Sequence, residues 1–146
     1  LGPLDPRDNA WREDLADLAL ADRIAVPNYV VPMELVALAR TPILTADRAD
    51  APAASELLPG ERFAVLDSGH GHAWGFSAAD RYVGHVALDR LAPTPVEGME
   101  GMVGPDDALL FRHPAVKAEV AGTLPLGARL RWTDHDDRFV RVAAGP

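Results

Sequence analysis

From residue 34 onward, short apolar runs alternate with clusters of Pro, Gly, Asp and Ser. Short runs bounded by turn residues at this spacing are typical of the strands of a small barrel or sandwich. The sequence therefore predicts a mostly β protein. The runs that predict strands are 35–38, 62–66, 72–77, 82–86, 108–111, 120–124, 128–133 and 139–142, and residues 41–52 are expected to form a long polar loop.

The two halves of the chain resemble each other. Residues 58–63, Leu-Pro-Gly-Glu-Arg-Phe, can be laid on residues 125–130, Pro-Leu-Gly-Ala-Arg-Leu. Between the halves, the segment Pro93-Thr94-Pro95 predicts a stiff, extended connection, because proline restricts the backbone. We therefore expect two tandem β modules, at residues 33–93 and 97–146.

The N-terminal segment, residues 1–32, carries a different pattern. Its leucines and Ile24 alternate with aspartates at roughly helical spacing over residues 5–26, and Pro27 and Pro32 follow. An apolar stripe of this period predicts an amphipathic helix, which prolines then end. We expect a short helical arm that packs across the modules.

Charge and composition exclude several classes of function. The chain carries 14 Lys and Arg against 22 Asp and Glu, for a net charge of −8, so the phosphate neutralisation that nucleic-acid binding needs is absent. It contains no long uninterrupted apolar stretch, so we expect no membrane insertion. It also has no cysteine, which excludes disulfides, thiolate metal ligands and a cysteine nucleophile. The compartment stays open between cytoplasm and periplasm or cell envelope.

Two polar motifs could be catalytic or metal-binding sites. Asp67-Ser68-Gly69 resembles the catalytic loop of a retroviral-type aspartic protease, but Gly84 follows too closely to leave room for a flap. Asp, Ser and Gly favour turns for backbone reasons, so a hairpin turn is the preferred interpretation. His70 and His72 could bind a metal, yet a tip rich in Gly and His is more often a solvated turn. We expect no metal and no cofactor.

Aromatic residues are the best candidates for binding. Alternation on the predicted strand 72–77 puts Trp74 and Phe76 on one face. We assign Phe76 to the core, and we take Trp74 and Tyr82 as a stacking or shape-reading pair, because both combine an apolar body with a polar group. Asp80 and His85 are their expected polar neighbours. No residue is predicted to be catalytic.

The order of these segments resembles a known family. The sequence from Asp5 to Ala16 resembles the opening arm of bacterial NlpC/P60 peptidases of the γ-D-glutamyl-L-diamino-acid type. Residues 73–76 and 81–86 resemble the distal strands of the first bacterial SH3-like domain of those enzymes, and residues 124–129 resemble their second. The resemblance implies a fold of two tandem SH3-like small β-barrels behind a short N-terminal helical arm, the second barrel lacking its last strand.

The resemblance also implies a role. In that family a papain-like Cys-His domain cleaves peptidoglycan stem peptides, and the SH3-like domains flank its cleft. This chain is thus expected to be a non-catalytic targeting and specificity region, with stem peptides or muropeptides and the C-terminal catalytic domain as partners. Two alternatives remain: a scaffold that only docks a partner protein, and an aspartic protease that uses Asp67.

Overall fold

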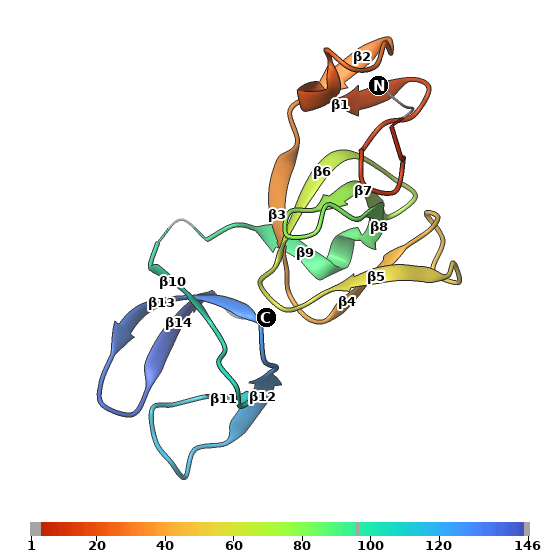
Figure 1. Ribbon diagram of the computed structural model, residues 1–146. Helices are drawn as coiled ribbons and strands as arrows, with labels where there is room; N and C mark the ends of the chain where they lie inside the picture. The colour runs from red at the N-terminus through yellow and green to blue at the C-terminus, as the bar shows by residue number, and fades with distance from the viewer. Residues whose placement is uncertain (1–3, 96, 145–146) are drawn as a thin grey trace.

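The computed structural model describes residues 4–95 and 97–144, and it is built from strands (Figure 1). This confirms the mostly β prediction. The strands are β1 (Leu15–Asp17), β2 (Asn28–Val30), β3 (Met33–Ala37), β4 (Thr41–Leu44), β5 (Ala53–Leu57), β6 (Arg62–Gly69), β7 (His72–Ser77), β8 (Val83–Ala87), β9 (Leu91–Pro93), β10 (Met99–Met102), β11 (Ala108–Phe111), β12 (Val120–Leu124), β13 (Arg129–His135) and β14 (Val140–Ala144). Two short 3-10 helices, η1 (Leu18–Leu20) and η2 (Leu88–Arg90), complete the described elements. None of the described helices is long and apolar enough to cross a membrane.

Residues 33–93, called here the first β region, form one seven-stranded sheet in the order β5-β4-β8-β7-β6-β3-β9. Its centre is the hairpin of β6 and β7, which turns at His70 and Gly71 with positive φ at both positions. Two such residues match the twist of the flanking strands, so the turn keeps the hairpin tight. The sheet order leaves β5 and β9 at its edges, so a closed ladder of strands is not seen among the described residues.

Both faces of this sheet are packed. Eight buried side chains form one hydrophobic cluster, and five form a second cluster. Phe63 is fully buried in the first cluster and Phe76 is buried in the second, as core residues should be. Strands whose two faces are both covered can carry near-continuous apolar runs, as Phe63 to Leu66 does.

The prediction of an N-terminal helical arm was wrong. Residues 4–32, called here the arm, form β1, β2 and the turn η1, and no α-helix is present among the described residues. The side chain of Asp17 accepts a hydrogen bond from the Ala19 N–H at 3.0 Å, and the Trp11–Ala16 bridge closes a tight loop. Such side-chain-to-backbone bonds compete with a helix. Leu18, part of the predicted apolar stripe, is 50% exposed.

The prediction of a polar loop over all of residues 41–52 was also wrong, because the loop is shorter than expected. Its first part is strand β4, in which Thr41, Ile43 and Leu44 are buried. Pro42 lies on that strand's exposed side and does not break it. The proline is therefore compatible with a strand here, although it cannot donate a ladder hydrogen bond.

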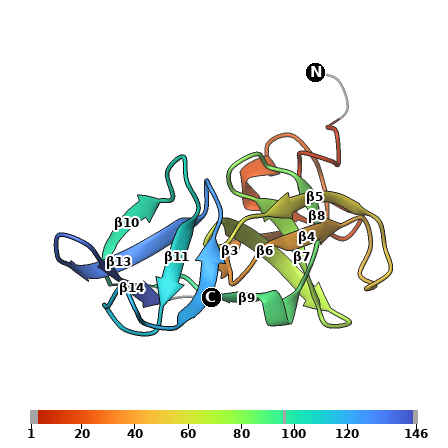
Figure 2. The same cartoon turned by 90° about the horizontal axis from the view of Figure 1, so that it is seen from below.

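Residues 97–144, called here the second β region, form two small sheets, one of order β10-β13-β14 and one of β11 and β12. Both views show these strands as a group beside the first β region (Figures 1 and 2). Their buried cluster contains three residues, Val103, Leu124 and Ala128. The division into two tandem SH3-like domains, with the second lacking its last strand, stays a prediction.

Candidate functional site

Three neighbouring strands bring polar and aromatic side chains together on one face of the first β region. Trp74 on β7 lies directly opposite His85 on β8, and Asp67 on β6 lies opposite Trp74 on its other side. Residues directly opposite in adjacent strands point to the same face. The sequence therefore folds so that one row across β6, β7 and β8 combines a carboxylate, an indole and an imidazole.

A fourth residue, Arg12 of the arm, covers this row. Its guanidinium carbon lies 4.7 Å from the centroid of the Trp74 ring, and it donates hydrogen bonds to Asp67 at 2.5 Å and Asp14 at 2.7 Å. A guanidinium over an indole face is a favourable cation–π contact. Trp74 is consequently only 8% exposed. We call Arg12, Asp67, Trp74 and His85 the arginine-covered face.

The arm is anchored beside this face by further contacts. Ala10 and Ala16 are fully buried, and the Arg7 carbonyl accepts a hydrogen bond at 2.8 Å from the N–H of Val83, the first residue of β8. Arg81, in the turn before β8, lies over the Phe76 ring at 4.5 Å from its centroid and forms an ion pair with Asp17 of the arm at 4.0 Å. The arm is thus an integral cover of the second hydrophobic cluster.

The electrostatics of the arginine-covered face follow from these contacts. The hydrogen bond from Arg12 holds the pKa of the Asp67 carboxyl below its ordinary value. Burial lowers the pKa of His85, an effect that the nearby charge of Asp47 partly opposes. At neutral pH the face therefore presents a charged carboxylate–guanidinium pair and a neutral imidazole, which can both donate and accept a hydrogen bond.

The tip of the β6–β7 hairpin carries a second polar group. His70 Nδ1 lies 2.6 Å from the Asp47 carboxylate, and His72 Nδ1 lies 3.0 Å from the His70 carbonyl oxygen. The contact with His70 holds the pKa of Asp47 below its ordinary value. Among the described residues, no group of three or more His, Cys, Asp or Glu is arranged to hold a metal ion.

The structure brings together only part of the predicted binding set. Trp74 and His85 are neighbours, but Tyr82 packs against the other hydrophobic cluster, so Trp74 and Tyr82 do not stack in this structure. The exposed Asp80 accepts a hydrogen bond from the Tyr82 N–H at 3.1 Å, which fixes the turn before β8. Ligand binding by these four residues stays a prediction.

Sequence reasoning missed Arg12 and Asp47. Their partners are far along the chain, because Arg12 contacts Asp67 across 55 positions and Asp47 contacts His70 across 23. The one local signal was the pairing of Arg12 with Asp14 two residues later. No sequence pattern pointed either residue toward the β6–β7 hairpin.

Asp67 has the wrong environment for the aspartic protease alternative. That chemistry needs two carboxylates that share a proton, so the pKa of one of them must be raised. Here Asp67 lies against Arg12, and its pKa is lowered. Its loop is part of the ladder between β6 and β7. The geometry is that of a structural ion pair at a hairpin.

Comparison with known proteins adds one finding. No curated protein matches the chain. Residues 43–91, which extend from β4 to the first residue of β9, match the family model of the bacterial dipeptidyl-peptidase Sh3 domain. Together with the strand content of this segment, the match identifies the core of the first β region as a bacterial SH3 domain, a non-catalytic module associated with peptidases.

Proposed function

We propose that this chain is the non-catalytic targeting and substrate-specificity region of a bacterial cysteine endopeptidase that acts on peptidoglycan stem peptides. It would flank the catalytic domain and shape its cleft. The observation that carries this proposal is the match of residues 43–91 to the SH3 domain of bacterial dipeptidyl-peptidases. The absence of cysteine from the chain is consistent with a nucleophile located in another domain.

The neighbourhood of β7 and β8 supports a role in contacting peptide. His85 is neutral and half-buried, so it can exchange hydrogen bonds with amide groups. Asp80 and Tyr82 lie just before the same strand and are more accessible than Trp74. A stem peptide carries amides, carboxylates and an amine, all of which these groups can bind.

An NMR titration of the chain with a stem tripeptide tests direct binding. We expect saturable shifts at His85, Asp80 and Tyr82, and weaker binding by the variant His85→Ala. The matched control is His113→Ala, an exposed histidine in the second β region, which should bind as the parent chain does. No shift in the β7–β8 neighbourhood at millimolar peptide would exclude direct binding.

The second candidate is a pure docking scaffold. The second β region exposes several large apolar side chains, among them Met99, Met102 and Leu109, and a protein partner could cover them. Calorimetry with the separately expressed catalytic domain separates the two functions. Tight association without any response to stem peptide favours the scaffold, and peptide binding without association favours the specificity region.

A further inference from the structure

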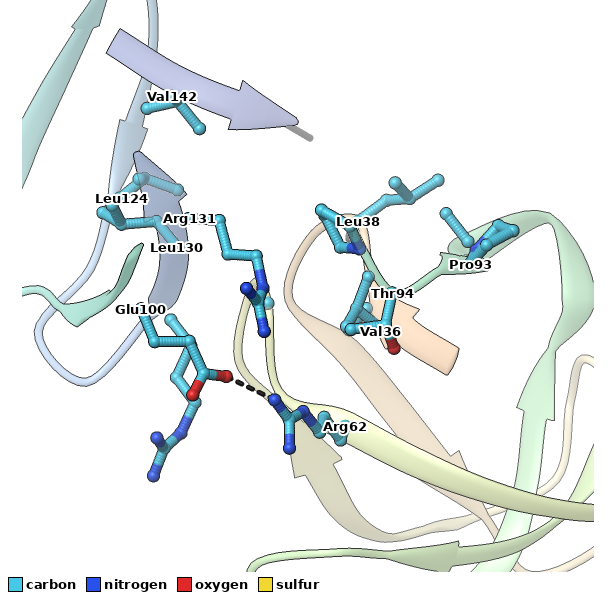
Figure 3. Close-up of a pocket in the computed structure, with 15 residues that line it drawn as sticks. Val36, Leu38, Arg62, Pro93, Thr94, Glu100, Leu124, Leu130, Arg131 and Val142 are labelled. Atoms are coloured by element: carbon cyan, nitrogen blue, oxygen red, sulfur yellow. Dashed lines mark hydrogen bonds and ion pairs between the residues drawn. The ribbon is translucent and has the colours of Figure 1, made fainter. Parts of the chain in front are cut away.

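A cleft lies between the two β regions, and its chemistry differs from that of the rest of the molecule. One wall comes from β3, β6, β9 and the segment after β9, and the other comes from β10, β12, β13 and β14 (Figure 3). The empty space of the cleft, its open mouth included, is about 630 Å³. Because the cleft opens to solvent, a peptide would lie across its mouth.

The lining of this cleft is basic. Its charged residues are three arginines, Arg62, Arg129 and Arg131, and one acid, Glu100. The whole chain, by contrast, has a net charge of −8. Grouped cations between low-dielectric walls focus their field on the cleft and favour an anionic occupant.

One carboxylate already occupies part of the cleft. Glu100 of the second β region forms an ion pair with Arg62 of the first, drawn as a dashed line in Figure 3. Glu100 also lies directly opposite Arg131 in the ladder of β10 and β13. Arg62 also lies 3.8 Å from the Glu34 carboxylate, so two acids pair with this one arginine. A carboxylate therefore already fits between the walls of the cleft.

Two arginines keep capacity for another anion. Among the described residues, Arg129 forms no ion pair, and Arg131 donates one hydrogen bond, to the Gly98 carbonyl at 3.0 Å. Because the two are two residues apart on β13, they point to the same face about 7 Å apart. An extended peptide with acidic side chains at alternate positions presents its carboxylates at the same spacing.

Apolar groups complete the site. Leu38 and Val36 line one wall, and Leu130, Leu124 and Val142 line the other (Figure 3). Leu124 is only 2% exposed and belongs to the core, so the apolar surface of the cleft comes from the other four side chains, which are partly exposed. An apolar residue between two acidic ones could contact this surface.

We propose that the cleft between the two β regions binds an extended acidic segment of a protein chain, through Arg129 and Arg131. The ordinary α-linked backbone sets the spacing of alternate carboxylates, whereas a γ-linked glutamate lengthens the backbone and changes it. The site is distinct from the β7–β8 neighbourhood and does not depend on the proposed function.

The test is an NMR titration of the full chain with acetyl-Glu-Leu-Glu-amide at low salt. We expect saturable shifts at the backbone amides of β13 and of Thr94. The neutral peptide acetyl-Gln-Leu-Gln-amide should cause none. The register control acetyl-Leu-Glu-Glu-amide, whose adjacent carboxylates point to opposite sides of an extended chain, should bind more weakly.

Substitutions of the two arginines test whether the peptide binds in the cleft. Arg129→Gln should weaken binding about tenfold, the effect of losing one charged hydrogen-bonded contact. The exposed control Arg112→Gln, which lies in the bend directly after β11 and does not line the cleft, should leave the affinity unchanged. Arg131→Lys should retain part of the affinity, because it keeps the charge and loses the forked geometry.

Three outcomes would overturn the proposal. The first is equal binding of the Glu and Gln peptides. The second is an unchanged affinity of Arg129→Gln. The third is a response of the cleft amides to a γ-linked stem peptide but not to the α-linked peptide. Failure of the stem-peptide titration at β7–β8 would affect the proposed function alone.

Discussion

The two β regions begin from similar patterns of short apolar runs and reach different degrees of packing. In the first region the sheet is covered on both faces, by one cluster of eight buried side chains and another of five. In the second region the cluster contains three buried side chains, while Met99, Met102 and Leu126 are exposed. The difference is the arm, whose Ala10 and Leu15 contribute to the second cluster of the first region.

This contrast shows how a small β unit gains a core. A domain of about 60 residues buries only about 60% of its unfolded surface, so an added layer has a large effect. The first region obtains that layer from residues that precede the match to the SH3 family. The second region has no equivalent cover among the described residues, and its exposed apolar side chains are where a partner would supply one.

The largest expected effect is from truncating the two cores. Phe63→Ala removes a fully buried ring from the first region and should lower the free energy of unfolding by about 3–5 kcal/mol. Leu124→Ala in the second region should cost less, because neighbours near the surface can move into the space. Urea denaturation of both variants measures this, and an equal loss would contradict the difference in packing.

The next largest loss of stability is expected from a substitution at Gly60, where the two β regions contact each other. Gly60 has φ +79°, and a Cβ there would lie 1.8 Å from the Arg129 carbonyl oxygen. The Arg129 N–H also donates to the Pro59 carbonyl at 2.8 Å. Gly60→Ala should therefore force the two regions apart. The variant should lose more free energy of unfolding than the backbone strain of alanine at positive φ accounts for.

Gly71→Ala is the matched control for that prediction. Gly71 has a similar φ of +75°, but a Cβ there would meet nothing within 4 Å. It should cost only the strain of an alanine at positive φ, about 1–2 kcal/mol. Urea denaturation measures the loss of stability in both variants, and the difference between the two losses is the contribution of the clash with Arg129. If the two variants lose equal stability, the regions are not held together at Gly60.

Removing the Arg12 side chain that covers Trp74 should cause a smaller loss of stability. Arg12→Ala removes the cation–π contact and the ion pair with Asp67, and should loosen the arm without unfolding the sheet. Both side chains of the pair are more than a third exposed, so solvent screening limits their coupling to about 0.5 kcal/mol. A double-mutant cycle with Asp67→Asn measures the coupling. Increased hydrogen exchange confined to the arm would confirm its location, and exchange throughout β6 and β7 would contradict it.

The pair with Arg12 also predicts a pH dependence. Because the pKa of Asp67 is lowered in the folded state, its stabilisation is complete above the unfolded value of about 3.9 and is lost as the pH falls through the lowered value. The difference between the parent chain and Asp67→Asn should therefore shrink in strong acid. Thermal melts from pH 6 to pH 2 test this.

The smallest expected effect is from His85. Burial lowers its pKa, so the unfolded chain binds a proton more readily than the folded one. Stability should be full above pH 6.5 and fall as the pH drops toward the lowered value. His85→Gln should remove that part of the slope. A slope that persists in the variant would assign it to other groups.

Much of the strand pattern could be predicted from the sequence. Strands β7, β11 and β12 have the predicted limits, because turn residues enclose each of them. The arm could not be predicted, since Asp17 and its neighbours bond to nearby backbone groups and the apolar residues pack on a distant sheet. An amphipathic pattern alone cannot separate these cases.

The sequence could predict only those parts of the candidate site whose residues lie close together along the chain. Trp74 and His85 lie on adjacent strands joined by a short turn, so their proximity follows from the chain. Tyr82 was expected beside Trp74, but it lies ahead of β8 and packs on the opposite cluster. Arg12 enters the site through a contact between residues 55 positions apart, which depends on the finished fold.

The contact of Arg12 with Asp67 and Trp74 has a consequence for the order of folding. During synthesis the arm leaves the ribosome before β6, β7 and β8 exist, so its docking surface is not yet present. Contacts between residues far apart in sequence form late, because closing a long loop costs entropy. The arm therefore emerges first and docks last, and until then Ala10 and Ala16 are available to chaperones and proteases.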